Sequence, residues 1–314
     1  MSFGTGIEPG PGMQGARRLL LSVRPMFFPA SVLPVLVGTG WGARAAGGLD
    51  AVAFALALAA TVGVHAAVNV INDVYDDISG TDPINTGRIH PFTGGSRFIQ
   101  NGIMDRRAMG RVGLVMLATA GGLGIVLALL EGPVVVALGL IGAALGVAYS
   151  ATPFQLSARG LGELAVGIGF GVLPVMGAAW LQSGRFELDA FLLSLPLGLW
   201  VFNILLVNEI PDIDADEAAG KRTLPVRWGL RGIWPLYLAA NGLAWIALAV
   251  AAAWGLMPFI VLAVPTLLIA VAVYVARMLA RGAPTRSTLT TAIKATLACH
   301  GAGGLWLAAF AWLS

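Results

Sequence analysis

Long apolar runs alternate with short polar loops along this chain, and the runs have the length of membrane-spanning helices. A span needs about 20 mostly apolar residues, and nine stretches meet that requirement. They lie near 19–42, 51–72, 111–130, 132–149, 161–181, 188–209, 232–254, 257–277 and 290–313. The pattern predicts an all-α, polytopic membrane protein built as a bundle of about nine transmembrane helices.

The first apolar run begins like a signal peptide, after Arg17 and Arg18. It continues through Arg24-Pro25 and past Val37, however, which is too long for a cleaved signal region. We therefore expect one retained first helix. Residues 1–16 are rich in glycine and lack periodicity, which predicts a mobile N-terminal tail before a single transmembrane domain over 17–314.

Basic residues sort to one side of this nine-span arrangement. Of the 19 Lys and Arg residues, all but Arg44 and Arg185 fall in the N-terminal flank or in loops after the even-numbered spans. Loops rich in Lys and Arg stay in the cytoplasm. The pattern therefore predicts an integral membrane protein with cytoplasmic active-site loops, its N-terminus inside and its C-terminus outside.

Composition supports the same class. Hydrophobic residues make up 57% of the chain and charged residues 11%, against about 25% charged in ordinary globular proteins. This excludes a soluble enzyme, a nucleic-acid binder and a disordered chain. The net charge of +3 therefore reflects how Lys and Arg orient the protein in the membrane rather than binding to nucleic acid. The single cysteine, Cys299, excludes an intrachain disulfide and a multi-cysteine metal site.

Acidic residues gather in two clusters, one after the second span and one after the sixth. The clusters are Asp73, Asp76, Asp77 and Asp82, and Glu209, Asp212, Asp214, Asp216 and Glu217. A helix C-terminus is already partly negative, and like charges three or four residues apart repel. Something positive is therefore expected to compensate both clusters.

The spacing within each cluster suits a divalent cation. Asn72, Asp73 and Asp76 share one helix face, while Asn208, Asp212 and Asp216 follow one another in steps of four. Mg²⁺ takes one or two carboxylates and completes its shell with water and substrate phosphates. The two clusters together predict a Mg²⁺ site on one side of the membrane.

Each acidic cluster is followed by a basic loop with small or hydroxyl residues. The loops contain Arg88, His90 and Arg97 around Thr93-Gly94-Gly95-Ser96, and Lys221 and Arg222 before Thr223. Such groups approach and neutralise phosphate oxygens. We therefore expect a two-sided clamp on a lipid diphosphate and Mg²⁺. If the diphosphate is allylic, cleavage leaves an allyl cation that aromatic walls can shield. Candidate wall residues are Tyr149, Phe154, Phe170 and Trp200.

These motifs resemble the UbiA superfamily of intramembrane aromatic prenyltransferases. Asn72-Asp73-Val74-Tyr75-Asp76 matches the first family motif, and Asp212-Ile213-Asp214-Ala215-Asp216 matches the second. Within the superfamily, the branch that makes menaquinone precursors is most similar. The resembling stretches run from residue 24 to residue 229.

The resemblance implies a nine-helix bundle with a cytoplasm-facing cavity and Mg²⁺-dependent transfer of a polyprenyl group to an aromatic acceptor. In the similar branch the acceptor is 1,4-dihydroxy-2-naphthoate, which also loses its carboxylate. The implied metal residues are Asn72, Asp76, Asp212 and Asp216, supported by Asp73, Asp82 and Asn208. The implied diphosphate contacts are Arg88, Lys221 and Arg222, and Arg24 and Glu163 would line the acceptor end.

The chain departs from that branch at three places. Asn208-Glu209-Ile210-Pro211-Asp212 lacks the usual arginine, and Pro211 should break the helix there. Arg97 replaces a glycine and adds a cation near the diphosphate, and Ser157 replaces a frequent lysine. The acceptor therefore stays open among dihydroxynaphthoate, 4-hydroxybenzoate, haem and a chlorin.

Three other activities are compatible with a polar site in a membrane bundle. Intramembrane acids can serve an ion-coupled transporter, although here they lie at helix ends beside basic loops. A terpene cyclase acting on the prenyl chain alone is a further alternative. A CDP-alcohol phosphotransferase is disfavoured because its Asp-Gly-x-x-Ala-Arg signature is missing. His65 and His300 are interpreted as packed histidines.

Overall fold

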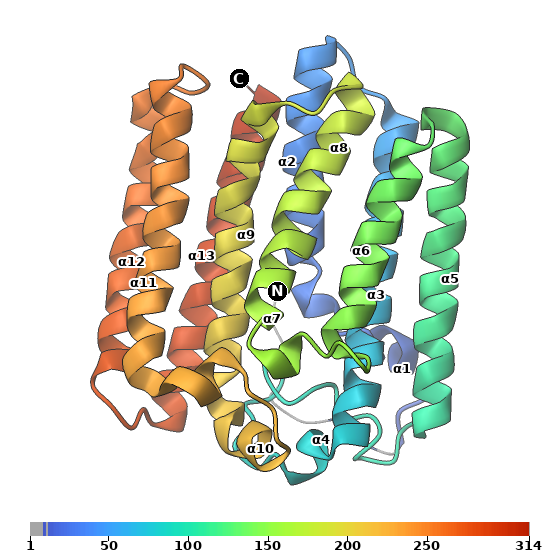
Figure 1. The fold of residues 1–314 in the computed structure, drawn as a ribbon, viewed down its shortest axis with the longest axis vertical. Helices are drawn as coiled ribbons and strands as arrows, with labels where there is room; N and C mark the ends of the chain where they lie inside the picture. Colours follow the sequence, from blue (N-terminus) through green and yellow to red (C-terminus); the bar gives the residue numbers. More distant parts are fainter. Residues whose placement is uncertain (1–8, 11, 314) are drawn as a thin grey trace.

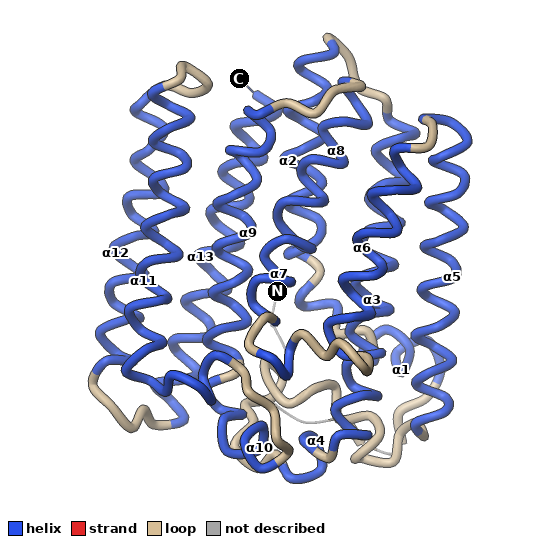
Figure 2. Tube along the Cα trace, viewed as in Figure 1, coloured by secondary structure: helices blue, strands red, loops and turns tan. Residues whose placement is uncertain are grey.

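The computed structural model describes residues 9–10 and 12–313 as helices joined by loops, without strands in that part of the chain (Figure 2). Most of the predicted mobile tail, residues 1–8 and 11, lies outside the described residues. The all-α fold class is confirmed. Large apolar side chains cover much of the outer surface, with Leu129 and Ile260 each 81% exposed. Such a surface suits lipid rather than water.

The predicted spans correspond to helices in the structure. Eight helical segments are long and apolar enough to cross a membrane, and a ninth, α6, has 17 residues. The long spans consist of α2 (Pro29–Ala46) with the short turn η1 (Pro25–Phe27), α3 (Ala51–Ser79), α5 (Arg106–Glu131), α7 (Gly162–Gly167) continuing through η3 (Ile168–Val172) into α8 (Leu173–Ser183), α9 (Leu188–Asn208), α11 (Leu224–Ala253), η5 (Phe259–Leu262) with α12 (Ala263–Ala280), and α13 (Arg286–Leu313). The short one is α6 (Val134–Ser150).

The predicted first span, near 19–42, is interrupted in the structure. A separate helix, α1 (Gly15–Ser22), ends before Arg24, whose φ of 55° is left-handed, and the span itself starts at Pro25. Proline disfavours helical backbone in the residue before it. Asn69 of α3 donates to the carbonyl of Val23 at 2.9 Å and holds this break in place.

Helices far apart in the sequence lie side by side in the bundle (Figure 1). Helix α2 packs closely on α8, where a Cβ on Gly38 would clash with the carbonyl oxygen of Val175. Small residues allow this approach between membrane helices. Helix α3 packs on α5, and α9 packs on α11.

Both acidic clusters lie at one end of the bundle, and the C-terminus lies at the other (Figure 1). The short helices α4 (Thr81–Ile84) and α10 (Ile213–Ala218) contact each other there. The predicted helix break at Pro211 is confirmed, because α9 ends at Asn208 and the 3-10 turn η4 (Ile210–Asp212) follows. We call this end of the bundle the acidic end.

Candidate active site

The last turns of α3 carry Asp73, Asp76 and Asp77 of the first acidic cluster, and α4 carries Asp82. Asn72 donates to the Ser150 hydroxyl of α6 at 3.2 Å, and Asp76 faces the opposite cluster. Asp73 is buried, and its Oδ2 accepts the Ser96 backbone N–H at 3.1 Å. Its Oδ1 is buried without a hydrogen-bond partner.

A left-handed glycine holds two carboxylates close together. A Cβ added to Gly95, whose φ is 72°, would lie 2.8 Å from Asp82 Oδ2 and 2.9 Å from Asp73 Oδ1. Asp82 is buried, and its backbone carbonyl accepts from the Arg97 guanidinium. Burial, and then the carboxylates of Asp76 and Asp73, raise the pKa of Asp82 to about 8. The loop glycine therefore provides room for acidic groups that repel each other.

Asp212 of the second cluster is supported by the loop between α4 and α5. Asp212 Oδ1 accepts from Asn85 Nδ2 at 2.8 Å and from the Thr93 hydroxyl at 3.0 Å. Sequence reasoning missed Asn85, and it assigned Thr93 to phosphate. The signal for Asn85 was weak, since it is one polar residue in a polar loop. Thus the loop after α3 positions carboxylates of both clusters.

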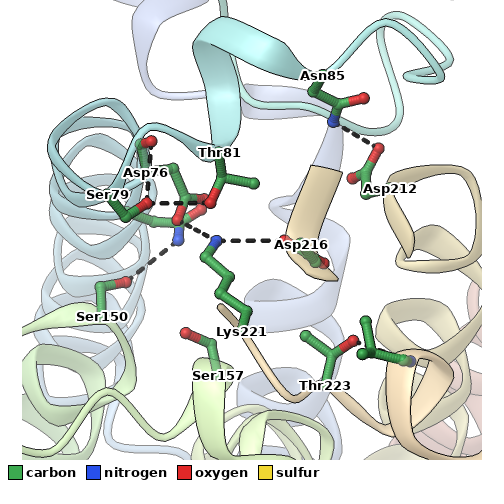
Figure 3. A network of polar contacts seen from close by, with 12 residues as sticks. Asp76, Ser79, Thr81, Asn85, Ser150, Ser157, Asp212, Asp216, Lys221 and Thr223 are labelled. Atoms are coloured by element: carbon green, nitrogen blue, oxygen red, sulfur yellow. Dashed lines mark hydrogen bonds and ion pairs between the residues drawn. The ribbon is translucent and has the colours of Figure 1, made fainter. Parts of the chain in front are cut away.

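Lys221 joins the two clusters (Figure 3). Its Nζ lies 2.6 Å from Asp76 Oδ1 and 3.5 Å from Asp216 Oδ1. Burial opposes the ammonium charge, but Asp76 and Asp216 outweigh it and raise the pKa of Lys221 above its usual range. Its backbone N–H also bonds the Asp216 carbonyl at 2.8 Å. This is the positive compensation expected for clustered acids at helix ends.

The remaining predicted polar residues lie around this centre. Arg88 is half-buried and donates to the Asn85 carbonyl at 2.7 Å. Arg222 is exposed in the loop that precedes α11. Glu163 lies behind the cavity wall rather than in it, against the buried carboxyl group of Glu209. Glu209 is a second residue that sequence reasoning did not place in the site.

An apolar cavity of about 1140 Å³ opens beside the acidic end. Asn72, Asn208 and Tyr149 line it, and each asparagine comes four residues before an aspartate of its cluster. Four residues of α3 span about 6 Å, so Asn72 stands between the cavity and Asp76. Asn208 is the last residue of α9, at the start of the turn that leads to Asp212.

Two of the four candidate aromatic residues belong to the cavity wall. Tyr149 and Phe170 line it, and the Phe170 ring packs edge-on to His65 with centroids 4.5 Å apart. Phe154 is instead 59% exposed and outside the cavity, and Trp200 is buried in the bundle core. Helical periodicity does not say which aromatic residues face a cavity, so these two expectations were wrong.

The acidic end fits Mg²⁺ only if substrate oxygens complete the shell. Within the described part of the chain, no three His, Cys, Asp or Glu side chains are arranged to enclose a metal ion. Asp76 and Asp216 nevertheless flank one cationic group, and the buried Asp73 Oδ1 and Asn208 Oδ1 lack partners. An all-oxygen set supplying one or two carboxylates per ion matches the way Mg²⁺ binds beside phosphates.

Comparison with known proteins assigns the fold and its chemistry. The UbiA prenyltransferase family matches residues 31–297. The chain belongs to this family. It is therefore a prenyltransferase and an integral membrane protein, which removes the transporter alternative. The resemblance inferred from the two aspartate motifs is confirmed.

Relatives of this UbiA-family protein include naphthoate prenyltransferases. It is 32% identical to the 1,4-dihydroxy-2-naphthoate octaprenyltransferase of Mycobacterium tuberculosis over 74% of this chain and 77% of that one. The Bacillus subtilis enzyme of the same name is 28% identical, over 71% of this chain and 70% of that one. A UbiA homologue from Archaeoglobus fulgidus bound to GPP and Mg²⁺ has the same fold, with a TM-score of 0.62 and 18% sequence identity. The match covers 93% of this chain and 99% of that one.

Proposed function

We propose that this protein transfers a polyprenyl group from an allylic polyprenyl diphosphate to 1,4-dihydroxy-2-naphthoate, with Mg²⁺ as its metal. The observation that carries this proposal is the junction of two carboxylate clusters by Lys221 beside a large apolar cavity. The polar end suits a diphosphate, and the cavity suits a hydrocarbon chain and an aromatic ring. The naphthoate relatives support the choice of acceptor.

Residues of the acidic end have distinct roles in this proposal. The metal would be held by Asn72, Asp73, Asp76, Asp82, Asp212 and Asp216. Bound Mg²⁺ would supply positive charge that stabilises the departing diphosphate. Lys221, Arg88, Arg97 and Arg222 would contact diphosphate oxygens, and Tyr149 and Asn208 would lie where the prenyl chain enters the cavity.

The chemistry is an electrophilic substitution on the acceptor ring. The carbon–oxygen bond to diphosphate breaks, its electron pair leaves with the diphosphate, and an allyl cation remains. The ring carbon that carries the carboxylate attacks this cation, and carbon dioxide then leaves while its bonding pair returns to the ring. Tyr149 and Phe170 would shield the cation and exclude water.

The orientation in the membrane is part of the proposal. Because the basic loops adjoin the acidic end, the positive-inside rule favours a cytoplasmic acidic end, an inside N-terminus and an outside C-terminus. The acidic-end opening of the cavity would then face the cytoplasm. The proposed partners are the lipid bilayer and the two substrates, and nucleic acid is not among them. The proposal holds for any oligomeric state.

Product analysis tests the function. Purified protein receives dihydroxynaphthoate and a labelled polyprenyl diphosphate with Mg²⁺ or excess EDTA, and products are followed by mass spectrometry. We expect a prenylated, decarboxylated naphthoquinol that disappears with EDTA and in folded Asp76→Ala or Asp212→Ala variants. Diphosphate release without that product would redirect the assignment to 4-hydroxybenzoate, haem, a chlorin or cyclisation.

A further inference from the structure

Two charged side chains of the described residues line the cavity, and both are cations. They are Arg24, at the break before the first span, and Lys294 of α13. No Asp or Glu of the described chain lines the cavity, because the acids lie beyond Asn72 and Asn208. An anionic group in this cavity therefore meets two positive charges and no facing carboxylate.

Lys294 has no partner of its own among the described residues. It forms no hydrogen bond or ion pair with any residue that the structure describes. It lies eight residues after Arg286, the first residue of α13, which is about 12 Å along the helix axis. Its side chain is exposed and lines the cavity, and an ionisable residue that faces a cavity within a membrane bundle marks a binding site. Its neighbours Leu297 and Gly301 line the same cavity.

Arg24 reaches the cavity beside a loop residue, Phe92, that also lines it. Its Nη2 donates to the Phe92 carbonyl at 3.3 Å, and Phe92 packs in the same buried cluster as Ile293, which precedes Lys294. The Arg24 guanidinium also lies 4.8 Å from the Phe27 ring centroid, and its Nε is buried without a partner. Two cations from opposite ends of the sequence thus line one cavity.

We propose that Lys294, together with Arg24, binds the carboxylate of an aromatic acid acceptor, and that Lys294 determines the preference for acidic acceptors. This inference rests on the proposed prenyl transfer. The aromatic body of the acceptor would lie against the wall that includes His65 and Phe170. Because the carboxylate leaves as carbon dioxide, this contact exists with the acceptor but not with the product. Lys294 therefore favours binding of substrate and release of product.

A binding experiment tests Lys294 apart from turnover. The ligands are 1-hydroxy-2-naphthoate, which carries the carboxylate, and 1-naphthol, which lacks it. In Lys294→Gln we expect carboxylate binding to weaken by about tenfold or more, as for loss of a charged hydrogen bond, and naphthol binding to change by less than about twofold. Lys294→Arg should recover most of the affinity. Arg286→Gln removes a charge from the same helix outside the cavity, and it should bind like the wild type.

Several results would overturn the inference. These are unchanged naphthoate binding in Lys294→Gln, an equal loss for both ligands, or a rise in KM confined to the polyprenyl diphosphate. The last would assign Lys294 to the donor. If the wild type makes no prenylated naphthoquinol but still binds hydroxynaphthoate through Lys294, the proposed acceptor fails while the carboxylate site stands.

Discussion

Lys221 Nζ lies 2.6 Å from Asp76 Oδ1, although 145 residues separate the two in the chain. Lys221 comes from the loop before α11, and Asp76 from the last turns of α3. The side chains are only 12% and 20% exposed, so water screens their charges weakly. This ion pair fixes the distance between the two halves of the proposed diphosphate site.

Removal of the ammonium should therefore impair catalysis more than folding. We expect Lys221→Ala to lower kcat/KM for the polyprenyl diphosphate by about 10²–10³-fold, the range for loss of one electrostatic contact to a developing charge. Lys221→Arg should retain part of the activity. Arg231→Ala, at an exposed position of α11, is the matched control for loss of charge. Full activity in Lys221→Ala would remove this residue from the site.

A methyl group on Gly95 should disrupt the acidic end. It would clash with the carboxylates of Asp82 and Asp73 and would strain a left-handed backbone. We expect Gly95→Ala to lower both the Tm and the Mg²⁺-dependent activity. Gly102→Ala separates the two effects, since Gly102 has a φ of 66° but nothing within 4 Å of its Cβ position. If both variants lose the same activity, backbone strain rather than the carboxylate contact is responsible.

Asn85 should tune metal affinity through Asp212. Its side-chain amide orients Asp212 Oδ1 at 2.8 Å, and loss of such support usually costs about 10–100-fold in metal affinity. We therefore expect Asn85→Ala to raise the Mg²⁺ concentration for half-maximal activity by about tenfold. Thr86→Ala, at an exposed neighbouring position, should match the wild type. An unchanged Mg²⁺ dependence would show that Asp212 acts without Asn85.

The protein without metal should lose stability as the pH rises. The pKa of Asp82, about 8 in the folded state, lies above its usual value of 3.8. Between these values the folded protein holds a proton that the unfolded chain has released, so the free energy of unfolding falls with increasing pH. In EDTA the Tm should be lower at pH 8 than at pH 5, and Asp82→Asn should reduce this difference. A difference of the same size in Asp82→Asn would assign it to other groups.

Added Mg²⁺ should oppose that pH trend. Metal ligands must be deprotonated, so binding is tighter where the carboxyl groups ionise readily. We expect Mg²⁺ to raise the Tm more at pH 8 than at pH 5, and the increment to shrink in Asp76→Asn. Equal increments at both pH values would indicate an ion bound elsewhere.

Local sequence signals determined the spans and the position of the acids. Each membrane helix satisfies its own backbone hydrogen bonds, so hydropathy alone located helices such as α3 and α9, and Pro211 predicted the break after Asn208. Spacing placed Asp76 beside Asn72 on one face, and the charge rule implied compensation by cations. These properties depend on residues within a few turns of one another.

Tertiary structure decided which of those groups meet. Asn69 of α3 donates to the Val23 carbonyl and stabilises the break at Arg24, a contact that hydropathy does not register. The contacts of Asp212 with Asn85, and of Lys221 with Asp76, depend on how the segments around α4 and α10 meet at the acidic end. Only the packed bundle also shows which side chains line the cavity. Direction and distance across helices are properties of the assembled bundle, whereas periodicity describes one helix at a time.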